Sequence, residues 1–293
     1  MLRVCFLTSL AMLAFAGNSL LCRLALKGGH IDPMSFTLLR LASGACMLAA
    51  LAYFGAARPG RQRRPTGTWF GAFSLCGYAV AFSLAYVGMD AGPGALVLFA
   101  AVQLSMLAYG LATGERLGIV ATGGLALSLG GLAFLLLPGS SAPPVGSAAL
   151  MVAAGMAWGA YTLHGRRVAS PLAATAGNFL RATLIAGALL LPFVPVLEWS
   201  GTGVVYALVS GAVASGLGYV IWYGVLRDLM VTQASIVQLS VPVISVLAGI
   251  PLLHEPLTPR VALSCLGVLG GMAIVLLARR RPGPGRRARA RTR

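Results

Sequence analysis

The run Gly118–Leu137, GIVATGGLALSLGGLAFLLL, contains 20 residues and no charged side chain. A helix that crosses the hydrocarbon core of a bilayer needs about 20 such residues. The 293-residue chain has nine further apolar segments, bounded by Gly, Pro and charged residues, at about 4–26, 34–54, 67–88, 92–112, 145–163, 173–194, 203–225, 232–252 and 260–278. The sequence therefore predicts an all-α integral membrane protein with ten transmembrane helices.

The composition agrees with this fold class. Hydrophobic residues make up 58% of the chain and charged residues only 10%, whereas soluble domains carry about 25% charged residues. So few charges cannot cover the surface of a water-soluble fold of this size. A cytosolic enzyme and a secreted soluble domain are therefore excluded.

The basic residues lie mainly in loops and in the tail, on the side that holds both termini. If the N-terminus is cytoplasmic, 17 of the 22 Lys and Arg fall on the cytoplasmic side and three on the far side. This asymmetry predicts that both termini are cytoplasmic. We expect the basic tail 280–293 to be disordered and to contact anionic lipid headgroups. No motif supports nucleic-acid binding.

The chain lacks the patterns of enzymes and metal sites. The five cysteines stand singly in apolar runs, and the three histidines lie at segment ends. No GxSxG, HExxH or Walker sequence occurs. We therefore predict no catalytic residue, no metal and no cofactor.

An internal repeat is the most informative pattern. Gly130-Gly131-Leu132-Ala133 and Gly270-Gly271-Met272-Ala273 close the fifth and tenth segments at an offset of 140 residues. Similar offsets relate Glu115 to Glu255, Arg40 to Arg181, and Gly77-Tyr78 to Gly218-Tyr219. Because each half holds five spans, the two halves would insert with opposite topology, as in many secondary transporters.

Ten spans in two inverted halves resemble the EamA family of the drug/metabolite transporter superfamily. The resemblance rests on Phe15-Ala16-Gly17-Asn18 and Trp158-Gly159-Ala160-Tyr161, the paired arginines, Gly-Glu-Arg-Leu at 114–117, His-Glu-Pro-Leu at 254–257 and the Gly-Gly pairs. It implies two EamA-like five-helix repeats, 1–140 and 141–279, with segments 5 and 10 at the periphery and the others lining a cavity. Within the family, the chain looks most like YddG-type exporters of aromatic amino acids. Phe15 departs from the pattern, because many members have Trp there.

Aromatic residues in the middle of the segments are candidates for substrate binding. They recur at helical spacing on segments three, six and eight, so those of one segment share a face. Packing or an interfacial aromatic belt would be an alternative role, and a belt fits Tyr86, Trp69 and Trp199 at segment ends. We interpret the mid-span set as cavity lining: Tyr78, Phe82, Trp158, Tyr161, Tyr219 and Tyr223.

Mid-span amides complete the candidate site. An amide that faces lipid is costly, so Asn18, Gln103, Asn178 and Gln238 should face another helix or the cavity. Asn178 could equally form a hydrogen bond across a helix pair. Pro242, which has no counterpart in the fourth segment, is a candidate hinge that would break the ninth helix and free backbone groups.

Arg40 and Arg181 are predicted to be intramembrane charges. Because both halves carry one, a shared structural role is the favoured interpretation, and binding of a substrate carboxylate is the alternative. All six acidic residues fall in loops or at segment ends. The lack of a mid-span acid favours transport driven by the substrate gradient, without ATP.

These observations predict a multi-pass protein of the bacterial inner membrane, monomeric or homodimeric, that exports small amphipathic metabolites by alternating access. Amino acids with aromatic or large apolar side chains are the expected substrates. The alternatives are an exporter of other metabolites or drugs and a non-transporting membrane scaffold.

Overall fold

The computed structural model describes residues 2–55, 66–114, 117–139, 142–165, 168, 170–226, 229 and 237–278. Apart from one isolated bridge between Ile31 and Trp199, these residues form helices and connections. The elements are α1 (Leu2–Lys27), α2 (Pro33–Gly55), α3 (Trp69–Gly88), α4 (Ala91–Ala112), α5 (Ile119–Leu136), α6 (Val145–Gly165), α7 (Pro171–Leu190), η1 (Leu191–Val196), α8 (Gly201–Val209), η2 (Ser210–Leu217), α9 (Gly218–Leu226), α11 (Ser240–Leu253) and α12 (Pro259–Ala278). The basic tail 280–293 and Glu115 lie outside the described residues.

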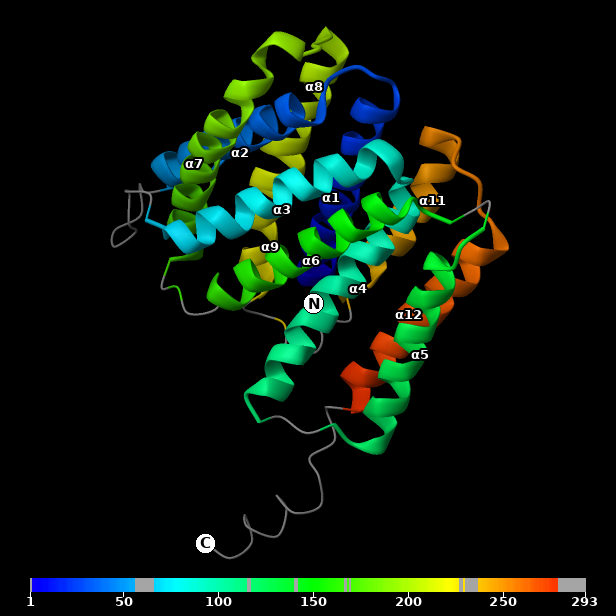
Figure 1. Cartoon of the computed structure of the whole chain (residues 1–293). Coiled ribbons are helices and arrows are strands. Elements are labelled where there is room, and N and C mark those ends of the chain that lie inside the picture. Colours follow the sequence, from blue (N-terminus) through cyan, green and yellow to red (C-terminus); the bar gives the residue numbers. More distant parts are fainter. Residues whose placement is uncertain are drawn as a thin grey trace, which may run out of the picture.

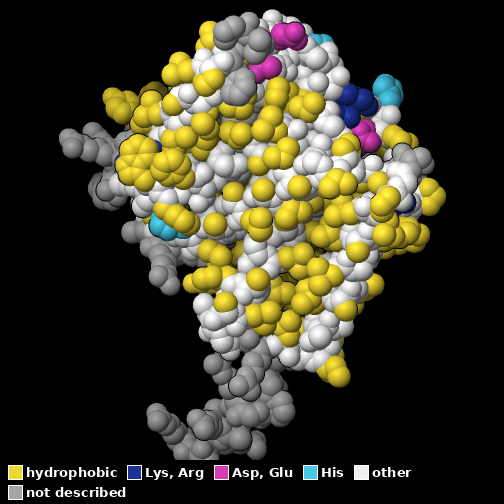
Figure 2. Space-filling model, in the orientation of Figure 1, with side chains coloured by type: hydrophobic (Ala, Val, Ile, Leu, Met, Phe, Trp, Pro, Cys, Tyr) yellow, Lys and Arg dark blue, Asp and Glu magenta, His cyan; other side chains and the backbone are white. Residues whose placement is uncertain are grey.

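The helix lengths fit a bilayer. Within the described ranges, nine helices are long and apolar enough to cross a membrane, and α11 is a shorter apolar helix. Figure 2 shows hydrophobic side chains spread over the middle of the visible face, while most charged side chains lie near one end. The chain is therefore a multi-pass membrane protein, as the composition predicts.

Proline and short polar side chains set several helix ends. Pro33, Pro171 and Pro259 are each the first residue of a helix, where the missing N–H is not needed. Asp32 caps α2 through its Oδ1, which accepts hydrogen bonds from the N–H groups of Met34 (3.0 Å) and Ser35 (2.9 Å).

Three predicted segments differ from the observed helices. The ninth, 232–252, corresponds to the shorter α11, and its residues 232–236 lie outside the described residues. The segment predicted over 173–194 ends as an α-helix at Leu190, and the proline-containing η1 continues it as a 3₁₀ helix because proline disrupts α-helical hydrogen bonding. The eighth segment is helical throughout, but its middle third, η2, is a π-helix. Such π segments are often found at functional sites.

The contacts between helices match across the two predicted halves of the chain. α3 and α4 both pack on α6, while α8, η2, α9 and α11 all pack on α1. α2 packs on α7, and α5 packs on α12. Figure 1 shows α5 and α12 as a pair at one side of the bundle. Two halves related by a pseudo-twofold axis would give this pattern; the inverted repeat itself remains a prediction.

Glycines allow the close packing of α5 against α12. A Cβ atom on Gly131 would lie 2.8 Å from the backbone nitrogen of Val268, and one on Gly271 would lie 2.5 Å from the carbonyl oxygen of Gly124. Ser128 donates a hydrogen bond to the carbonyl of Val268 at 3.3 Å, across the 140-residue offset of the repeat. The two helices meet through their backbones, as small residues allow in membranes.

We expect Gly131→Ala to destabilise the protein, because its methyl group would force α5 and α12 apart. Overpacking of this kind costs about 1–3 kcal/mol, measurable as a lower melting temperature in detergent. The matched control is Gly130→Ala, where the added Cβ meets nothing within 4 Å. Equal melting temperatures for the two variants would show that this contact is not tight.

Candidate functional site: an aromatic cavity between the helices

A small cavity of about 30 Å³ lies in the centre of the bundle. Its lining comes from α1, α2, α3, α4, α6, η2, α9 and the residues just before α11. The described lining includes no residue of α5, α7 or α12. The predicted peripheral position of α5 and α12 therefore agrees with the structure, whereas α7, which was expected to line the cavity, contributes no described lining residue.

The cavity brings together seven of the predicted site residues: Asn18, Arg40, Tyr78, Phe82, Trp158, Tyr219 and Gln238. Trp158 is at the centre of the aromatic contacts. Its ring centroid lies 4.7 Å from that of Tyr78 and 5.3 Å from that of Tyr219. Phe15 contacts Tyr219 edge-on at 5.9 Å. The rings thus come from both predicted halves and form one cluster.

A chain of hydrogen bonds holds this cluster in place. Ser210 donates to Oδ1 of Asn18 at 2.6 Å, and Nδ2 of Asn18 donates to the hydroxyl of Tyr78 at 3.2 Å. Asn18 and Ser210 are buried, so this network satisfies polar groups that would otherwise be costly. The π-helix that begins at Ser210 is thereby tied to α1 and α3.

Tyr161 and Asn178 lie elsewhere, in a separate pocket of about 200 Å³ beside residues 66–68. The Oδ1 of Asn178 accepts a hydrogen bond from the backbone N–H of Thr68 at 2.8 Å, and its Nδ2 donates to the Tyr161 hydroxyl at 3.5 Å. Asn178 therefore forms the bond between helices that we named as its alternative role.

The remaining predicted residues have mixed positions. Gln103 is buried on α4 next to the lining residue Val102, but it is not among the residues that line the cavity. The side chain of Tyr223 lies outside what the structure describes. Pro242 lies in the first turn of α11, and the chain makes a turn at Leu239. Because proline cannot donate to the carbonyl four residues earlier, this interruption fits the expected break, and the hinge role stays a prediction.

Arg40 and Arg181 have different surroundings despite their equivalent positions in the repeat. Arg181 is part-buried, and its Nη1 donates to the carbonyls of Thr66 and Gly177. Arg40 is 2% exposed, and its guanidinium carbon lies 5.1 Å from the ring centre of Tyr78 and 4.9 Å from that of Phe82. Arg181 also lies over a ring, that of Trp69, at 5.7 Å. Both arginines therefore have cation–π contacts, and Arg181 is bound by backbone carbonyls in addition.

A second group of charges closes one end of the bundle. On α1, Arg23 donates to the carbonyls of Tyr86 (2.8 Å) and Val87 (3.0 Å) and to Oδ1 of Asp90 (3.0 Å). Its Nε lies 3.8 Å from Oε1 of Glu255. We did not predict this network, because 165 residues separate the two carboxylates in the sequence and neither looks buried there.

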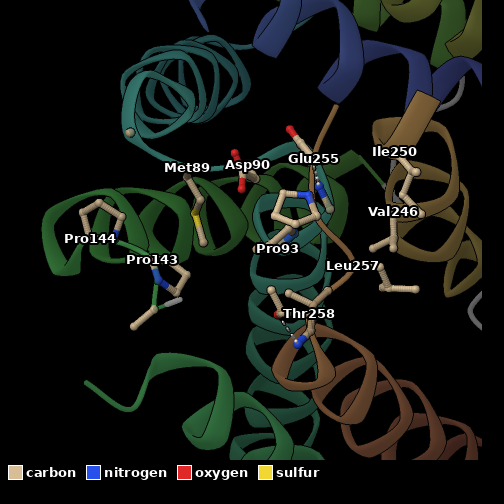
Figure 3. A pocket seen from close by; sticks show the side chains of 15 residues that line it. Met89, Asp90, Pro93, Pro143, Pro144, Val246, Ile250, Glu255, Leu257 and Thr258 are labelled. Atoms are coloured by element: carbon tan, nitrogen blue, oxygen red, sulfur yellow. Dashed lines mark hydrogen bonds between the residues drawn. The ribbon is translucent and has the colours of Figure 1, made fainter. Parts of the chain in front are cut away.

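Glu255 lies at the N-terminus of α4, not at that of α12, the helix that follows it in the sequence. It is 7% exposed, and its carboxylate accepts hydrogen bonds from the N–H groups of Ala91 (2.8 Å) and Gly92 (3.4 Å) at the start of α4. Figure 3 shows Glu255 with Asp90 and Pro93 in a pocket of about 270 Å³, formed by the ends of α3, α4, α6, α11 and α12.

Tyr86 connects the cavity to this charged end. Its ring packs edge-on against Phe82 at 4.7 Å, and Phe82 packs against Tyr78 at 5.3 Å. Tyr86 is fully buried, so its assignment to an interfacial belt was wrong; Trp69 and Trp199 are each 58% exposed and fit a belt. Tyr86 is buried because the end of α3 contacts both Arg23 of α1 and Ala91 at the start of α4.

Glu255 should make stability depend on pH. Burial raises the pKa of its carboxyl above the ordinary value of 4.5, and the nearby Asp90 raises it further; the N–H groups of Ala91 and Gly92 and the charge of Arg23 lower it. Between 4.5 and the raised pKa, the folded protein holds a proton that the unfolded chain has lost. Stability from this group therefore falls as pH rises through that interval.

We expect the melting temperature of the wild type, relative to Glu255→Gln, to fall as the pH is raised from 4.5. The glutamine has no proton to lose, so the difference between the two proteins isolates this carboxyl. Asp90 and Lys27, which donates to the carbonyl of Leu253 at 2.8 Å, are present in both proteins. A difference that grows with pH would mean that Arg23 lowers the pKa more than burial raises it.

The sequence also resembles known transporters along most of its length. The "EamA-like transporter family" profile matches residues 146–277. A probable terminal-alkyne amino-acid exporter of Streptantibioticus cattleyicolor is 30% identical over 280 residues, 90% of this chain and 92% of that protein. The chain belongs to the EamA-like transporter family. It is therefore a transporter and not an enzyme.

Further relatives agree with this assignment. An uncharacterized protein of Pseudomonas aeruginosa is 57% identical over 281 residues. The match covers 94% of this chain and 96% of that protein. The uncharacterized transporter YoaV of Bacillus subtilis is 25% identical over 85% of this chain and 89% of its own. A solved crystal structure of another protein has a TM-score of 0.67 to this chain at 22% sequence identity. The match covers 94% of this chain and 99% of that one. That likeness shows a shared fold.

Proposed function

We propose that this EamA-family transporter exports amphipathic amino acids, with aromatic or large apolar side chains, through the bacterial inner membrane. The observation that carries this proposal is the central cavity, where rings from α1, α3, α6 and α9 surround the polar groups of Asn18 and Arg40. Such a lining suits an apolar body with a polar headgroup. The relative named as a probable amino-acid exporter supports the same substrate class.

The cavity must enlarge for transport. Its free volume of about 30 Å³ has room for about two water molecules, whereas an aromatic amino acid is several times larger than that. Binding therefore needs the two halves to separate. Alternating access does this by opening the cavity to one side of the membrane at a time.

The Arg23–Asp90–Glu255 network is the proposed outer gate. It joins α1, the start of α4 and the connection before α12, so it crosses between the halves. With both termini in the cytoplasm, this end faces the outside. The ladder Tyr86–Phe82–Tyr78 then provides a direct path of packed rings from the gate to the cavity.

Counterflow in liposomes tests the proposed function. Vesicles that contain the purified protein and unlabelled phenylalanine should accumulate labelled phenylalanine, tyrosine or tryptophan from outside, with saturation and without ATP. Threonine and protein-free vesicles serve as controls. Uptake of threonine alone would contradict the aromatic preference, and uptake of none of the four would contradict amino-acid transport.

A further inference from the structure

Arg40 carries a buried positive charge that no described residue neutralises. Its side chain lines the cavity, and its Nε and Nη1 atoms are buried with no hydrogen-bond partner among the residues that the structure describes. The described acids Asp32, Asp90, Glu198 and Glu255 form no ion pair with it; those ion pairs that the structure describes belong to Arg23. Unsatisfied buried donors are rare in folded proteins, and an ionised one is especially costly.

The comparison with Arg181 shows that this cost is not a consequence of the position in the helix. Arg181 occupies the equivalent place in the second half and satisfies its Nη1 with two backbone carbonyls. Both arginines contact aromatic rings, but those under Arg40, Tyr78 and Phe82, line the cavity. Cation–π contact holds the group there but leaves its N–H donors available.

Resting on the proposed function, we infer that Arg40 binds the carboxylate of the transported molecule. A guanidinium matches a carboxylate in shape and charge, and such pairs are strong where water is excluded. The apolar body of the substrate would then lie among Phe15, Trp158 and Tyr219. The cavity thus selects monocarboxylates with an apolar body, amino acids included, and the α-amino group is not required.

The same charge excludes amines that lack a carboxylate. An amine would bring a second positive charge beside Arg40 with no described acid to offset either, and like charges in a desolvated site repel strongly. The predicted order of binding is therefore phenylalanine and 3-phenylpropionate together, with phenethylamine far weaker. These three share the phenyl ring and differ in the charged groups alone.

Competition against labelled phenylalanine, with purified protein in nanodiscs, tests this inference. On the wild type, we expect 3-phenylpropionate to compete within about tenfold of phenylalanine, and phenethylamine to be about 30-fold weaker or more, as for loss of one partner of a buried charge pair. Equal competition by phenethylamine would overturn the role of Arg40 and leave amino-acid transport intact. Failure of labelled phenylalanine to bind at all would contradict both proposals.

Substitutions of the two arginines test whether Arg40 causes the preference for carboxylates. Arg40→Gln should weaken phenylalanine binding by about 30-fold or more and remove the preference for 3-phenylpropionate over phenethylamine, whereas Arg40→Lys should keep the preference. The matched control, Arg181→Gln, removes the equivalent arginine outside the cavity and should keep both affinity and preference. If Arg40→Gln does not fold, the ligand series on the wild type and Arg40→Lys still decides. An unchanged preference in a folded Arg40→Gln would overturn the assignment.

Discussion

Trp158→Ala is expected to reduce phenylalanine counterflow by about 30-fold, equal to about 2 kcal/mol of binding free energy. The ring of Trp158 contacts those of both Tyr78 and Tyr219. Its loss removes the side chain that connects the aromatic residues of α3 with those of α9. The measurement is initial flux in liposomes at equal amounts of reconstituted protein. Because the residue is part-buried, the variant should still fold.

Trp69→Ala is the control for this variant. Trp69 begins α3, is 58% exposed and lies outside the cavity lining. It should keep flux within about twofold of the wild type, because exposed substitutions usually change stability by less than about 0.5 kcal/mol. Equal losses in the two variants would mean that the cavity around Trp158 is packing and not a binding site.

Arg23→Met should produce the largest loss of stability, about 3 kcal/mol or more. Arg23 is about 10% exposed, and removing it leaves the buried Glu255 without its cation and the carbonyls of Tyr86 and Val87 without their donor. Breaking a buried ion pair by removing one partner costs about 3–5 kcal/mol. Thermal unfolding in detergent measures the effect.

The matched control is Arg260→Met, which removes an exposed bond from Nη1 to the carbonyl of Leu137. Its melting temperature should stay close to that of the wild type. If Arg23→Met unfolds at the same temperature as Arg260→Met, the network does not join the helices as described. Restoration of stability by Arg23→Lys would show that the charge matters more than the fork of the guanidinium.

The sequence predicted the helices well, for identifiable reasons. Apolar length, Gly and Pro punctuation and loop charge are local properties, and the predicted ends of α3, α4, α5 and α12 fall within two residues of those observed. The family resemblance added the placement of α5 and α12. The π-helix η2 was not predictable, because its sequence SGAVASGL carries no distinctive local signal.

The site was only partly predictable. Spacing along a helix grouped Tyr78 with Phe82, and the repeat suggested that the second half would supply Trp158 and Tyr219. The repeat misled where the surroundings of equivalent residues differ, as for Arg40 and Arg181. The burial of Glu255 depends on α4, whose start lies 164 residues earlier, and a sequence pattern cannot report such a contact.

Photolabelling tests the central claim, that the aromatic cavity is the transport site. Membranes that contain the protein are irradiated with p-azidophenylalanine, and the labelled peptides are identified by mass spectrometry. We predict label on α1, α3, α6 or α9, at residues that line the cavity, and its loss when excess phenylalanine is present. Label that phenylalanine displaces from α5 and α12, or from the pocket around Asp90 and Glu255, would contradict the account.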